Sequence, residues 1–203
     1  IGGSLSFNVS NNAAYAGDSG ITLGSSYVAN NLTLNSANGS ITQSGAIAVG
    51  GLAGFTAANG NVTLGMAANN FGVVSASAQN LSFGDTGGLQ LGAMNTAGNL
   101  SVNSSGAVTQ SGALFADKLI VNSVGGLNLV GSNTVNTIEL SDSSGYVSYI
   151  GSGGALTVLS GSAAGQYAVQ NTGSVLVSGN LTAGGALGVQ GNGVTNTGTL
   201  IGA

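Results

Sequence analysis

The stretch between positions 81 and 140 repeats a strand-like triplet at a constant interval of 19: Leu81-Ser82-Phe83, Leu100-Ser101-Val102, Leu119-Ile120-Val121 and Ile138-Glu139-Leu140. A second series with the same interval lies between these triplets, at Leu89, Val108 and Leu127. Apolar side chains flank the central residue of each triplet, which is the period-2 alternation of a half-buried strand. A fixed period of this length indicates a stack of repeated coils rather than a globular core.

A chain that makes one coil per period places each strand beside its copy in the next coil, in parallel. Gly, Asn and Ser between the strands suit tight turns, and no segment shows helical periodicity. We therefore predict an all-β fold, a right-handed parallel β-helix (β-solenoid) with about 19–21 residues per coil. Residues 1–203 are expected to form one continuous segment of roughly ten coils, about 50 Å long at a strand spacing of about 4.8 Å.

The period also predicts which side chains stack inside the coil. One inward column contains Leu81, Leu100, Leu119 and Ile138. A second inward column contains Phe83, Val102, Val121 and Leu140, and we expect it to continue at Leu159. These columns are the predicted core.

Four polar residues occupy notable positions in the same register. Gln43 and Gln110 fall at inward positions, where a buried amide must be hydrogen-bonded; we expect each to cap backbone groups at a corner of the coil. Asn103 and Asn122 follow their strands in equivalent places, one period apart. Stacked amides can bond along the axis, so an Asn ladder is predicted there.

A longer repeat overlies the coil. Residues 41–46 read Ile-Thr-Gln-Ser-Gly-Ala and residues 108–113 read Val-Thr-Gln-Ser-Gly-Ala, an offset of 67. Residues 32–36 and 100–104 match as well. Chance similarity in a chain built from few residue types is the alternative, and the agreement of both blocks favours a true repeat.

The composition excludes several functions. The chain has no Cys, Pro, Trp, His or Arg, one Lys and a net charge of −4, which argues against nucleic-acid binding. No apolar run is long enough to span a membrane. The carboxylates are scattered, so we expect no catalysis, no cofactor and no metal. Asp85 and Asp142 are expected to be solvated acids in turns.

Three sets of residues carry a family likeness: Gly98-Asn99-Leu100-Ser101-Val102, the two Ile/Val-Thr-Gln-Ser-Gly-Ala blocks, and Val194-Thr195-Asn196-Thr197-Gly198-Thr199-Leu200. Together they resemble filamentous-haemagglutinin-like adhesins, the large exoproteins of bacterial two-partner secretion. The resemblance implies a right-handed parallel β-helix that is secreted and displayed at the bacterial cell surface. It also implies adhesion to a receptor or glycan on a host or neighbouring cell, or presentation of a distal tip.

Two other functions stay open. Neither Ile1 nor Ala203 lies beside a capping charge or Pro, so each end is expected to continue into more β-helix, in the same chain or in another copy stacked axially as a filament. An ice- or crystal-binding solenoid would need a flat face of Thr in register. Thr33, Thr42 and Thr63 point outward but are not expected to form a regular column.

Overall fold

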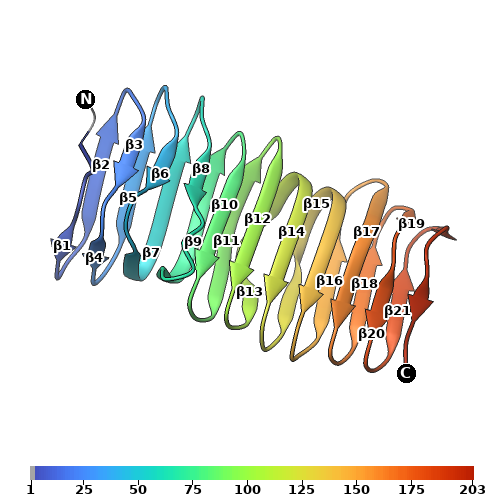
Figure 1. The fold of residues 1–203 in the computed structure, drawn as a ribbon. Helices are drawn as coiled ribbons and strands as arrows, with labels where there is room; N and C mark the ends of the chain where they lie inside the picture. The colour runs from blue at the N-terminus through green and yellow to red at the C-terminus, as the bar shows by residue number, and fades with distance from the viewer. Residues whose placement is uncertain (1–2) are drawn as a thin grey trace.

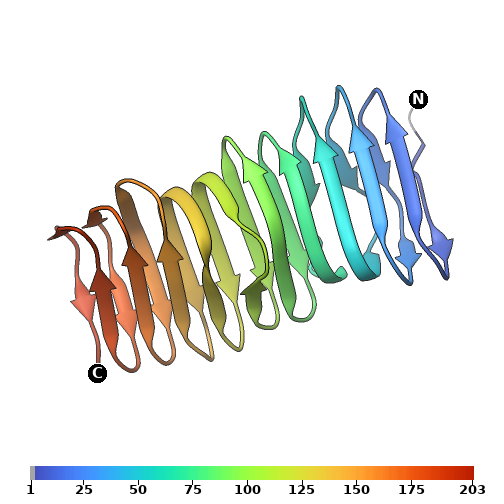
Figure 2. The ribbon, with the colours of Figure 1, turned by 180° about the vertical axis from the view of Figure 1, so that it is seen from behind.

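The computed structural model describes residues 3–203 as one stack of parallel strands, with the two ends of the chain at opposite ends of the stack (Figures 1 and 2). The predicted β-solenoid is confirmed, with about 10 coils of roughly 19 residues and no helix among the described residues. Accordingly, this part of the chain contains no helix long and apolar enough to cross a membrane.

The strands are short because Gly, Asn and Ser turns interrupt each coil. In chain order they are β1 (Asn8–Val9), β2 (Ala13–Gly17), β3 (Ile21–Leu23), β4 (Ser26–Val28), β5 (Leu32–Ser36), β6 (Ile41–Gln43), β7 (Ile47–Ala57), β8 (Val62–Leu64), β9 (Asn70–Ala78), β10 (Leu81–Asp85), β11 (Leu89–Thr96), β12 (Asn99–Ser104), β13 (Val108–Gln110), β14 (Leu114–Ser123), β15 (Leu127–Asp142), β16 (Val147–Gly151), β17 (Leu156–Ala163), β18 (Tyr167–Asn171), β19 (Val175–Val177), β20 (Leu181–Ala183), β21 (Leu187–Gln190), β22 (Val194–Asn196) and β23 (Leu200–Ile201).

Pairing between coils sorts these strands into three stacks, which we call A, B and C. Stack A runs through β3, β6, β8, β10 and β12 into the later halves of β14 and β15. Stack B runs from the start of β11 through β13 and the start of β15 to β16, β18 and β21. Stack C runs through β2, β5 and the later parts of β7, β9 and β11.

The side chains of the first inward column lie in stack A. Leu81, Leu100, Leu119 and Ile138 are paired in register, and each is at most 1% exposed. Phe83, Val102, Val121 and Leu140 pair in the same strands and are fully buried. Alternation therefore directs two apolar side chains per strand into the core, as the period-2 pattern requires.

The expected continuation of the second column at Leu159 is wrong. Leu140 pairs with Gly161, because the register shifts between Ile138 and Glu139 and β17 holds one extra residue there. A β-bulge of this kind moves every later side chain of its strand by one position. Leu159 is only half-buried as a result.

The longer repeat does not stack on itself. Residues 41–43 lie in stack A, whereas the matching residues 108–110 lie in stack B. Residues 32–36 lie in stack C, whereas the matching residues 100–104 lie in stack A. The offset between the copies corresponds to about three and one third coils, so each copy of the repeat is turned by one stack relative to the copy before it.

The buried column leads to a test of the register. Leu100→Asp should lower the free energy of unfolding by about 3 kcal/mol or more, because an unpaired charge would lie in a fully buried apolar column. Ser101→Asp should change it by about 0.5 kcal/mol or less, since that side chain points outward. Chemical denaturation measures both, and equal losses would show that the register is wrong.

Candidate functional site

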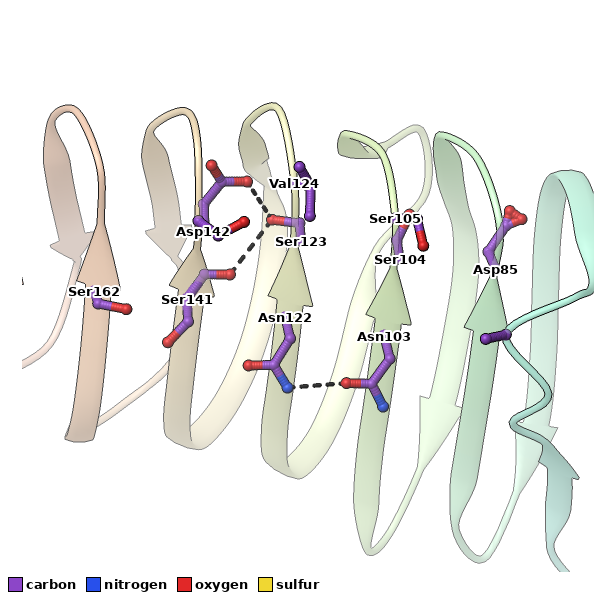
Figure 3. Close-up of a pocket in the computed structure, with 12 residues that line it drawn as sticks. Asp85, Asn103, Ser104, Ser105, Asn122, Ser123, Val124, Ser141, Asp142 and Ser162 are labelled. Carbon is purple, nitrogen blue, oxygen red and sulfur yellow. Dashed lines mark hydrogen bonds between the residues drawn. The ribbon is translucent and has the colours of Figure 1, made fainter.

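The most developed surface feature lies where the strands of stack A end. Asp85 pairs with Ser104, and one coil farther on Ser123 pairs with Asp142, so the four side chains follow one another along the axis (Figure 3). All four are buried, and the two carboxylates are only 1% and 2% exposed. The expectation that Asp85 and Asp142 are solvated is therefore wrong.

These side chains satisfy backbone groups that the turns leave unpaired. Ser104 donates to the Gly87 carbonyl at 2.5 Å and accepts from the Gly106 N–H at 3.2 Å. Asp142 accepts from Ser123 Oγ at 2.7 Å and from three backbone N–H groups, those of Gly126, Ser144 and Gly145. Asp85 accepts from the Phe71 N–H at 3.1 Å. Because buried polar groups are costly unless paired, this row holds the corner of the coil together.

The two carboxylates differ in their electrostatics. Burial raises the pKa of Asp85 above its ordinary value of 3.8, and its backbone hydrogen bonds only partly oppose this. Burial also acts to raise the pKa of Asp142, but the Ser123 hydroxyl and the backbone N–H groups outweigh it, so that the pKa lies below 3.8. Asp142 thus stays ionised in acid where Asp85 is already protonated.

A shallow groove of about 310 Å³ runs over this row, from Ala67 to Ser162 (Figure 3). We call it the A groove. Its outer wall includes Asn103 and Asn122, and Asn122 Nδ2 donates to Asn103 Oδ1 at 2.9 Å. Both amides are exposed, whereas the floor of Asp and Ser is buried. The predicted ladder position is therefore also the edge of a surface groove.

Gln43 and Gln110 lie half-buried at corners of the coil, and each binds a fully buried Asn that sequence reasoning missed. Gln43 pairs through both amide atoms with Asn69, at 2.8 and 3.0 Å. Gln110 pairs in the same way with Asn133, at 2.6 and 3.2 Å. The two Asn side chains are 0% exposed. Because the Gln–Asn spacings are 26 and 23 residues, the period of the coil gave no signal for these partners.

Both Gln side chains also bond the backbone. Gln110 Nε2 donates to the Gly112 carbonyl, and its Oε1 accepts from the Gly131 N–H at 3.0 Å. Gln43 makes the equivalent bonds to the Gly45 carbonyl and the Met66 N–H. The amide pair thus recurs once in each copy of the longer repeat, in different stacks.

The outward threonines are more regular than the sequence suggested. Thr22, Thr42 and Thr63 lie in register in stack A, and the Thr22 and Thr42 hydroxyl oxygens are 3.2 Å apart. Thr33 lies separately, in stack C. Ser82 and Ser101 continue the column, which then reaches Ile120 and Glu139. This hydroxyl column is interrupted by an apolar and a charged residue. Another outward column also stacks hydroxyls, at Ser141, Ser162 and Thr182.

Groups that could support chemistry are sparse. Lys118 Nζ and Glu139 Oε1 form an ion pair at 2.7 Å on the surface of stack A. Within residues 3–203, no three His, Cys, Asp or Glu side chains gather as they would to hold a metal ion. The buried carboxylates are occupied by turn hydrogen bonds. What the site offers a ligand is a wall of neutral amides and hydroxyls.

Fold and site together define a repeat protein of the β-solenoid class. The chain belongs to the family described as repeats of unknown function (DUF5649), whose profile matches twice, over residues 10–77 and 78–144. The spacing of the two matches agrees with the longer repeat found in the sequence. No curated protein and no solved structure matches the chain significantly.

The Gln–Asn pair generates a stability prediction. Asn133→Ala removes a side chain that also donates to the Leu129 and Ile150 carbonyls at 2.9 Å, and leaves several buried groups unpaired. We expect a loss of about 2–4 kcal/mol in the free energy of unfolding. Asn122→Ala, which removes an exposed amide, is the control and should cost about 0.5 kcal/mol or less. Similar losses for the two variants in urea denaturation would contradict the structural role of the pair.

The two buried carboxylates generate a pH prediction. Because the folded-state pKa of Asp85 is raised, its contribution to the free energy of unfolding is full below pH 3.8 and is lost as the pH rises. Asp85→Asn should therefore leave the free energy of unfolding nearly unchanged at pH 7. The folded-state pKa of Asp142 is lowered instead. Its contribution to the free energy of unfolding is therefore full above pH 3.8 and is lost in stronger acid. Asp142→Asn should therefore cost about 1–3 kcal/mol at pH 7, and less in strong acid.

Thermal unfolding at neutral pH and in acid compares the two variants with the unaltered chain. If Asp85→Asn destabilises at neutral pH as much as Asp142→Asn does, the opposite electrostatics of the two sites are refuted.

Proposed function

We propose that this chain is part of an extracellular shaft, a structural and adhesive segment of a large bacterial surface protein. One observation carries the proposal: the coils form an uninterrupted stack whose inner columns are apolar and whose two ends lie far apart (Figure 1). Repeats that each contact only their neighbours build long, stiff bodies. Such a body suits the task of holding something at a distance from a surface.

The adhesive and extracellular parts of the proposal rest on other support. The residues that resemble filamentous-haemagglutinin-like adhesins lie in strands β6, β12, β13, β22 and β23 and in the turns beside them. Only six residues are charged, and many outward positions hold amides and hydroxyls, beside exposed apolar side chains such as Phe115 and Val130. A neutral, hydrogen-bonding surface fits adhesion to a receptor or glycan better than electrostatic capture.

We infer that the segment is not catalytic. The buried acids, Asp85 and Asp142, are used in turns, and Ser123 donates to a carboxylate that is already held by backbone N–H groups. General acid–base work needs paired titratable groups open to a substrate.

A filament built by axial stacking is the second candidate. The last coils expose apolar side chains of the stacked columns, among them Val194 (47%) and Leu200 (45%). A following coil would cover them, whether it belongs to the same chain or to another copy. At the other end of the stack, Ile1 lies outside the described residues, so the matching expectation stays a prediction. The interrupted Thr column gives no comparable support to ice or crystal binding.

The proposal is tested on cells that make the protein and on beads that carry the purified chain. An antibody against the chain should label intact cells as strongly as permeabilised ones, and coated beads should adhere to host or neighbouring cells more than uncoated beads. Labelling that requires permeabilisation contradicts the extracellular location, and beads that do not adhere contradict the adhesive role.

A further inference from the structure

The A groove has counterparts on the other two stacks. A groove of about 370 Å³ in stack B is lined by Gln170, Asn171 and Gln190, and a groove of about 260 Å³ in stack C is lined by Asn35 and Ala37. We call these the B groove and the C groove. Each lies beside a strand end, as the A groove does.

The three grooves recur at the offset of the longer repeat, the first two within the two copies that the family profile matches and the third beyond the second copy. Asn35, Asn103 and Gln170 follow one another at offsets of 68 and 67, and each is an exposed outward amide. The next residues, Ser36, Ser104 and Asn171, are buried, and each donates to a backbone carbonyl 17 residues earlier in the chain. Because each copy is turned by one stack, the same groove appears on stacks C, A and B in turn.

The walls of these grooves have unused hydrogen-bonding capacity, unlike their floors. The Asn122–Asn103 bond uses one donor and one acceptor, and the Asn103 Nδ2 and the Asn122 Oδ1 have no other hydrogen bond among the described residues. The side chains of Asn35, Gln170 and Gln190 are exposed and make no hydrogen bond among the described residues. Polar atoms with this freedom can bind a ligand without breaking the corner.

The lining restricts what that ligand is. Neither Lys nor Arg borders a groove, so phosphate, sulfate or carboxylate groups would find no cation. Asp18 borders the C groove and disfavours anions further. Val124 and Ile150 are the large apolar side chains at the A and B grooves, too few to anchor a hydrophobic peptide. Amides pair well with hydroxyl groups, which indicates a neutral, hydroxyl-rich partner.

The shape restricts it further. The A groove crosses the coils from Asp85 to Ser162, about 20 Å at the spacing of parallel strands, yet holds only about 310 Å³. A long, shallow groove parallel to the axis fits an extended chain rather than a compact molecule.

We propose that a binding groove for a neutral glycan chain recurs along the shaft at the offset of the longer repeat, and that the three grooves face three directions around the shaft. This inference rests on the proposed adhesive function and names its partner class. Each groove is shallow and binds weakly. Grooves repeated along one shaft gain strength on a glycan-covered surface, because each binding event raises the effective concentration for the next. A shaft with grooves on every side engages such a surface whatever its rotation about its own axis.

The test measures binding of two neutral oligosaccharides, cellohexaose and maltohexaose, to the full chain by NMR, with hexagalacturonate as the acidic comparison. At least one neutral sugar should shift the side-chain amide signals of Asn103, Asn122, Gln170 and Gln190, and the acidic sugar should not. Binding of neither neutral sugar at millimolar concentration overturns the proposal, as does preferential binding of the acidic one.

Variants assign the binding to the grooves. The double variant Asn103→Ala with Asn122→Ala removes the amides of the A groove. Gln170→Ala with Gln190→Ala removes those of the B groove, and Asn35→Ala removes that of the C groove. Each set should lower the sugar bound at saturation by about one third, and all three together should abolish binding. Asn95→Ala with Asn128→Ala is the matched control, because these outward amides line none of the three grooves. Unchanged thermal unfolding shows that every variant folds.

Cell adhesion separates this inference from the proposed function. Beads carrying the variant without grooves should lose adhesion. If they adhere as well as unaltered beads, the grooves are not the adhesive element and a protein receptor binds elsewhere. The glycan inference is then wrong, and the proposed adhesive function is retained. If unaltered beads do not adhere but the chain binds a neutral sugar at the grooves, the adhesive role fails and the glycan site stands.

Discussion

The parallel ladder between successive coils is the constraint on which the rest of the structure depends. Backbone N–H groups bond carbonyls one coil away, as in Leu89 N–H to Ala107 at 2.9 Å and Val108 N–H to Gly126 at 3.0 Å. Each side chain therefore lies on the side chain of the matching position in the next coil. Inward positions along the strands are apolar in most coils, with the polar exceptions at the corners, and each outward position forms a column of its own. The core and the surface of the molecule both follow from this one geometry.

Corners are where the ladder alone does not suffice. A turn points backbone groups away from their partners in the next coil, and burial there is expensive unless something replaces the lost bonds. Ser36, Ser104 and Asn171 meet the need with one short polar side chain, and Asp142 with a carboxylate that gathers three backbone N–H groups. The Gln110–Asn133 pair does so with two amides that also bond each other. Buried polarity in this chain is therefore concentrated at the corners.

The sequence predicts what the ladder controls and misses what the corners decide. Leu100 and Val102 are identifiable as core because the period of the coil and the alternation agree at those positions. Leu159 is misplaced because a bulge changes the register without changing the apolar pattern. The burial of Asp85 and Asp142 is missed because the sequence around an Asp at a strand end does not show whether the following turn covers the carboxylate or exposes it to solvent. Asn69 and Asn133 are missed because corner partners obey no fixed spacing.

The mismatch between repeat and coil shapes the whole surface. Had the repeat been a whole number of coils, identical residues would have stacked in one column, and one face would have carried every copy of a feature. With about three and one third coils per copy, a feature encoded once moves from stack to stack, and about three copies, or ten coils, bring it back to the first. Adding or removing one copy in such an array turns everything beyond it by one stack. Adding three copies lengthens the shaft by about ten whole coils, so the far end keeps facing in its original direction.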